Sequence, residues 1–212
     1  MSNHLGLLKK AENKSCDKLL EELFYKITVQ LKNYLKSNEW FTERYIDSVL
    51  ESLTSYFKLR PEKDQGINQA LVDRAHVRTI QESIKALYRN SKCSDDNRII
   101  LAGRMKKDSD RLKTYFVQKS STVTWINDVI LLLAEIIEID DPESLKVVIA
   151  DLILKYPDVS KKHIYALLNI RGNVSKSCLR GTIKDAIKNN NGRSSCNNLF
   201  DGIKVKSSCT IL

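Results

Sequence analysis

The last four residues of the sequence carry its most specific chemical signal. Cys209-Thr210-Ile211-Leu212 is a Cys-a-a-X box, in which a prenyltransferase alkylates the thiol of Cys209. The terminal Leu212 indicates a geranylgeranyl rather than a farnesyl group. A single prenyl chain holds a protein at a membrane only reversibly, so stable anchoring needs a second signal. We therefore expect a lipidated tail with a second membrane-binding element, and an unmodified tail is the alternative.

The residues before the box can supply that second signal. Cys196 is a second site that a fatty acyl chain could occupy. Three basic residues can contact an anionic bilayer: Arg193, Lys204 and Lys206. Each contributes about 1 kcal/mol near such a surface. Asn189–Ser195 has the composition of a linker, so residues 189–212 are predicted to form a flexible basic tail.

The charge of the chain is polarised. The formal net charge is +9, but Val123–Asp158 contains eight acidic and only two basic residues. Residues 176–212 contain seven basic and two acidic residues. Because the positive end also carries the lipidation motif, this distribution favours an anionic membrane surface over nucleic acid as the partner. A basic nucleic-acid binder remains the alternative.

The other reactive side chains are dispersed. His4, His76 and His163 lie in no spacing that suggests a metal site or a catalytic triad. The five cysteines are odd in number and scattered, which is typical of a protein from the reducing cytosol. Asp140-Asp141 is better explained by a helix terminus than by acid–base catalysis. We therefore expect no enzyme, no metal and no cofactor.

A basic run marks a helix expected over Arg98–Gln118. Its basic residues are Arg104, Lys106, Lys107, Arg111 and Lys113. Such a run is usually a solvated face, and docking on an acidic partner or lipid is the alternative.

Apolar spacing predicts an all-α protein. Only seven glycines and three prolines occur, and no stretch of any length shows strand alternation. Met1–Lys14 is polar and is expected to fray, and residues 15–188 are expected to form a helical bundle region. Within that region helices are predicted over 16–36, through Phe41–Phe57, and over 67–90, 98–118 and 123–139. Further helices are predicted from Pro142 to Tyr156, from a cap at Asp158 or Ser160 to Gly172, and over 175–188.

The most apolar part of the chain is Val123–Asn173. A helix over 123–139 leaves only a narrow polar arc, which predicts a central bundle helix. Acidic residues interrupt it, which argues against a membrane span. Pro142 suits the first turn of the next helix, Tyr156-Pro157 ends that helix, and Gly172 closes the third. Asp158 or Ser160 is expected to cap the third helix.

Short motifs in this region resemble a known family. They are Leu133–Ile137, Asp140–Pro142, Tyr156–Lys161, Ala166–Leu168 and Gly172-Asn173. In order and spacing they resemble the C-terminal signature of the exocyst complex component 3 family. That family includes tumour necrosis factor alpha-induced protein 2 (M-Sec) and the exocyst component 3-like proteins. The resemblance extends loosely from about residue 15 to about residue 188. It implies the last two bundles of an extended rod in which helical bundles are stacked end to end.

The resemblance also implies a function. It implies non-enzymatic tethering or scaffolding in exocytosis, with exocyst subunits and SNARE proteins as partners. For the M-Sec branch it implies plasma-membrane protrusions formed with Ral-type small GTPases. With the lipidated tail, it predicts a cytoplasmic protein at the inner face of the plasma membrane. The chain is short for this family, so a free-standing adaptor or truncated regulator that competes with longer members is the alternative.

Overall fold

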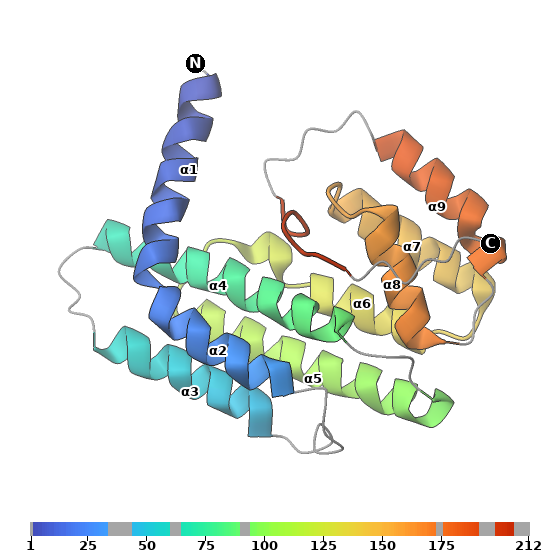
Figure 1. Cartoon of the computed structure of the whole chain (residues 1–212), viewed down its shortest axis with the longest axis horizontal. Coiled ribbons are helices and arrows are strands. Elements are labelled where there is room, and N and C mark those ends of the chain that lie inside the picture. The colour runs from blue at the N-terminus through green and yellow to red at the C-terminus, as the bar shows by residue number, and fades with distance from the viewer. Residues whose placement is uncertain are drawn as a thin grey trace. The chain divides into compact units, whose positions relative to one another are not determined.

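The protein is helical throughout the part of the chain that the structure describes. This computed structural model describes residues 2–33, 44–59, 65–89, 94–172, 176–190 and 198–205 (Figure 1). These ranges contain no strand, which confirms the all-α prediction. The elements are α1 (Ser2–Leu19), α2 (Glu21–Asn33), α3 (Arg44–Lys58), α4 (Gln65–Tyr88), α5 (Asp95–Gln118), the short 3-10 helix η2 (Thr124–Ile126), α6 (Val129–Glu138), α7 (Pro142–Lys155), α8 (Lys161–Arg171) and α9 (Lys176–Asn190).

The chain divides into two compact units. Unit 1 comprises Met1–Ser83 and Asp110–Trp125, and unit 2 comprises Ile84–Ser109 and Ile126–Leu212. The long helices α4 and α5 therefore each contribute residues to both units.

Unit 1 is built around the packing of α2 on α3 (Figure 1). Both helices bury one face with the predicted helical spacing. The buried residues are Leu20, Leu23, Phe24, Ile27 and Leu31, with Ile46, Val49 and Leu53 on α3. The helices expected over 16–36 and through Phe41–Phe57 are thus present here as α2 and α3, within Glu21–Asn33 and Arg44–Lys58.

The N-terminal residues differ from the prediction. The first helix was expected to begin at residue 16, but α1 already begins at Ser2. The helical hydrogen bonds continue across Leu20, whose N–H donates to the Cys16 carbonyl at 2.9 Å. The polarity of Met1–Lys14 suggested fraying, but leucine, lysine and alanine are good helix formers whether or not they are buried.

The central helix is shorter than expected. Instead of one helix over 123–139, η2 is followed by a turn, and α6 begins at Val129. Asn127 is buried at this turn, and its carbonyl accepts a hydrogen bond from Ser109 Oγ at 3.4 Å. Asn and Asp are weak helix formers, so Asn127-Asp128 can leave the helix when a tertiary contact is offered.

Unit 2 surrounds α6. Seven of the ten residues of α6 are buried, and the helix packs on both α7 and α8 (Figure 1). Asp141 caps α7 by accepting the Ser144 N–H at 2.7 Å, with Pro142 in the first turn as predicted. Ser160 caps α8, and Gly172 ends it with a φ of 90°. Helix α9 packs on α7 and α8.

Candidate functional site

Residues Asn198–Val205, called the strap below, pack on unit 2. Leu199, Phe200 and Ile203 are only 0%, 1% and 4% exposed. The strap makes a tight turn in which the Ile203 N–H donates to the Phe200 carbonyl at 3.0 Å. Gly202 in this turn has a φ of 79°, which glycine adopts without strain. The structure thus differs from the expectation of a freely moving tail for these eight residues.

Asp158 holds the backbone of the strap. Its Oδ2 accepts the N–H groups of Phe200 at 2.5 Å and Asp201 at 2.9 Å. The other oxygen, Oδ1, is buried without a hydrogen-bond partner among the described residues. Burial raises the pKa of Asp158, although the two backbone donors act in the opposite direction. Asp158 therefore binds the strap and does not cap α8.

Two aromatic rings complete the strap pocket, which we define as Tyr156, Asp158 and His163. The Tyr156 and Phe200 ring centroids are 6.0 Å apart in an edge-on arrangement, and the His163 ring lies 5.3 Å from Phe200. His163 Nδ1 accepts the Ser160 N–H at 3.0 Å, so Nε2 carries the hydrogen that binds the Ile203 carbonyl at 2.8 Å. The neutral imidazole satisfies both contacts.

A clamp of two arginines holds the C-terminal end of α6. Arg98 Nη1 donates to the Ile137 carbonyl at 2.9 Å, and Arg171 Nη1 donates to the Ile136 carbonyl at 2.9 Å. Both side chains are almost fully buried, and Arg98 also pairs with Asp140 at 2.7 Å. The last carbonyls of a helix lack partners within it, so these guanidinium groups supply donors where the backbone has none.

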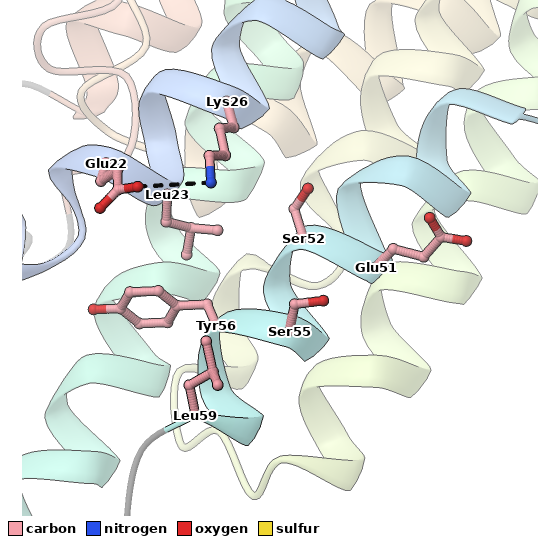
Figure 2. Close-up of a pocket in the computed structure, with 8 residues that line it drawn as sticks. All are labelled: Glu22, Leu23, Lys26, Glu51, Ser52, Ser55, Tyr56 and Leu59. Atoms are coloured by element: carbon pink, nitrogen blue, oxygen red, sulfur yellow. Dashed lines mark ion pairs between the residues drawn. The ribbon is translucent and has the colours of Figure 1, made fainter.

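Helices α2 and α3 form a groove in unit 1 of about 600 Å³ (Figure 2). Its lining residues are Glu22, Leu23, Lys26, Glu51, Ser52, Ser55, Tyr56 and Leu59. Leu23 is buried, whereas the Leu59 side chain is 84% exposed. Tyr56 is fixed by its hydroxyl, which donates to the Leu19 carbonyl at 2.7 Å.

The chemistry of this groove is that of a binding surface. The Glu22 and Lys26 side chains pair across one turn of α2 at 3.6 Å (Figure 2). The lining combines aliphatic, aromatic and hydroxyl groups and contains neither histidine nor cysteine. Such a mixture suits a protein surface with one apolar anchor and a polar rim.

The buried His76 belongs to a hydrogen-bonded Asp–Ser–His network, and these residue types also form catalytic triads. His76 Nδ1 lies 2.9 Å from Ser121 Oγ, which itself donates to Asp73 Oδ1 at 3.0 Å. Because the Ser121 hydrogen points to Asp73, the histidine is the donor and cannot activate the hydroxyl as a base. His76 stacks on Phe116 with centroids 4.0 Å apart, and burial lowers its pKa to about 4. The network is a structural contact within unit 1.

The basic residues predicted on α5 do not form one free face. Arg104 pairs with Asp108 at 3.2 Å, Lys106 pairs with Glu138, and Arg111 pairs with Asp47. Lys107 and Lys113 are the two members of the set that are exposed. Three of the five charges are thus matched within the chain.

Most of the predicted tail site lies outside the described residues. This holds for Cys196 and Cys209 and for Arg193 and Lys206, whereas Lys204 is described and exposed. Among the described residues, no helix combines the length and apolarity that crossing a bilayer requires. The same residues contain no group of His, Cys, Asp and Glu side chains that could hold a metal ion.

Comparison with solved structures shows the same fold. The chain resembles the crystal structure of M-Sec with a TM-score of 0.78 and 25% sequence identity. This similarity covers 90% of the chain and 33% of the M-Sec chain.

Comparison with known sequences agrees with this similarity. The chain is 28% identical to the exocyst complex component 3-like protein of Danio rerio and 25% identical to tumor necrosis factor alpha-induced protein 2 of Homo sapiens. These alignments cover 84% and 82% of the chain but only 24% and 27% of the relatives. The chain thus spans about a quarter of the length of these curated relatives. The family model for exocyst complex component Sec6 matches residues 2–176, and the chain therefore belongs to the Sec6 family of exocyst components.

Proposed function

We propose that the chain is a non-enzymatic tethering or scaffold module that acts in exocytosis or in the formation of plasma-membrane protrusions. The observation that supports this most strongly is the Sec6 family match over residues 2–176. The similarity to M-Sec in fold supports the protrusion branch of the proposal. The mechanism is binding by helical surfaces.

The proposed partners are other exocyst subunits, with SNARE proteins and Ral-type small GTPases as further candidates. The groove between α2 and α3 is the candidate contact surface, because it offers the exposed Leu59 beside a polar rim (Figure 2). An exposed apolar side chain beside polar residues suits the core and rim of a protein interface.

Co-precipitation from cells tests this proposal. We expect the full chain to recover exocyst subunits and Leu59→Glu to recover at least five-fold less, because a charge would replace the apolar anchor. Val117→Glu is the matched control, since Val117 is an exposed apolar residue of unit 1 outside the groove. Equal recovery by both variants would exclude the groove. Recovery of no subunit by the unmodified chain would favour the free-standing adaptor or truncated regulator.

We further propose a peripheral location at the inner face of the plasma membrane. Prenylation of Cys209, palmitoylation of Cys196 and the basic residues Arg193, Lys204 and Lys206 would hold the chain there. The exposure of Lys204 supports this proposal.

Intact-mass spectrometry of the protein from eukaryotic cells tests the lipid anchor. We expect the mass of a geranylgeranyl adduct together with loss of the last three residues, because transferases and their partner protease act on this box. Cys209→Ser should abolish the adduct, and Cys196→Ser should leave it. An unmodified C-terminus would remove the anchor from the proposal. Tight RNA binding that weakens steeply with salt, without binding to anionic vesicles, would favour a nucleic-acid binder.

A further inference from the structure

The strap is held in the way that binding sites hold short peptides. Side chains of the pocket bind three backbone groups of the strap: the N–H groups of Phe200 and Asp201 and the carbonyl of Ile203. Backbone hydrogen bonds supply affinity in peptide recognition, and side-chain pockets supply specificity. Here the buried side chains of Leu199, Phe200 and Ile203 would supply the specificity.

The strap also lies outside the matched family region. The family match ends at residue 176, and the strap begins at Asn198. Its receptor residues Tyr156, Asp158 and His163 lie within the match. A site within the family region is thus filled by a segment from beyond it.

We propose that Tyr156, Asp158 and His163 form a recognition site for a short turn-forming peptide, with the strap as its intramolecular ligand. The ligand pattern is aliphatic–aromatic–any residue–Gly–aliphatic, as in Leu199–Ile203. The aromatic residue packs near both the Tyr156 and the His163 rings, and the Gly allows the positive φ of the turn. The Asp position contributes its backbone N–H, because the Asp201 side chain is exposed.

Intramolecular attachment keeps the site filled in the unmodified chain. Seven residues, 191–197, separate the end of α9 from the strap. A connection of this length gives an effective concentration on the order of millimolar. A peptide in trans with the same contacts therefore competes poorly until the strap is weakened.

Peptide binding to the full chain tests the proposal. The probe is a fluorescent peptide with the sequence of residues 198–205. We expect Phe200→Ala to bind it at least ten-fold more tightly than the unmodified chain, because loss of the ring releases the strap. The same peptide with alanine in place of phenylalanine should not bind. Asp158→Ala should bind neither peptide, since it removes the acceptor for both N–H groups.

Hydrogen exchange separates this proposal from a purely structural role. In Phe200→Ala, the strap amides should exchange at least 100-fold faster while the amides of α6 stay protected. Asp201→Ala is the matched control and should change neither readout, because it retains the backbone donor. If Phe200→Ala does not fold, Gly202→Ala takes its place. A Cβ at residue 202 meets no atom within 4 Å, so the change weakens the turn only because alanine disfavours the φ of 79°. The proposal would be overturned if neither Phe200→Ala nor Gly202→Ala bound the peptide. It would also be overturned if the strap amides of these variants exchanged as slowly as the amides of α6.

Discussion

Replacing Arg171 by alanine is expected to lower the free energy of unfolding by about 3–5 kcal/mol. The side chain is 1% exposed, and it binds the carbonyls of Ile136 and Ile139. Without it these buried acceptors lose their partner, and a large cavity opens beside α6. Urea unfolding followed by circular dichroism measures the effect.

Two further variants sharpen the test of the clamp. Arg180→Ala removes an exposed arginine of α9 and should stay within about 0.5 kcal/mol of the unmodified chain. Arg171→Lys should lie between the two, because one ammonium group does not reproduce the planar fork of donors. A loss below about 1 kcal/mol for Arg171→Ala would mean that water replaces the guanidinium group at the carbonyls.

Acidification from pH 7 to pH 4 is expected to cost the fold about 3 kcal/mol through His76 alone. Burial lowers the pKa of His76 from 6.5 to about 4. Between these two values the unfolded chain binds more protons than the folded chain, so protonation favours unfolding. The stabilisation is complete above pH 6.5 and is lost as the pH falls towards 4.

The variant His76→Phe isolates this effect. Phenylalanine can keep the stacking on Phe116 without titrating, and Ser121 keeps its bond to Asp73. Urea unfolding at pH 7, 5.5 and 4 should show a shallower pH dependence for the variant, by about 3 kcal/mol over the full interval. An unchanged pH dependence would show that His76 is protonated in the folded state without cost.

Local signals in the sequence predicted the central region well. Pro142, Tyr156-Pro157 and Gly172 act on their own backbone, and the helix limits that they predicted are confirmed. The start of α6 was missed because it depends on the contact between Ser109 and the Asn127 carbonyl, which only the folded chain brings together. Sequence spacing carries no information on such a distant pair.

The binding features were harder to predict than the helices. Arg98 and Arg171 are far apart in sequence and meet at the end of α6, so no local pattern in the sequence predicts the clamp. The strap was missed because the basic residues around it suggested a solvated tail. The apolar residues Leu199, Phe200 and Ile203 around Gly202 were the signal that could have revealed it.

The buried carboxyl group of the strap pocket has a consequence for how the protein responds to its surroundings. Because the pKa of Asp158 is raised in the folded state, its contribution to stability is largest in acid and fades as the pH rises through that raised value. His76 in unit 1 has the opposite sign. Acidification would therefore destabilise unit 1 through His76 and favour the folded form of unit 2 through Asp158.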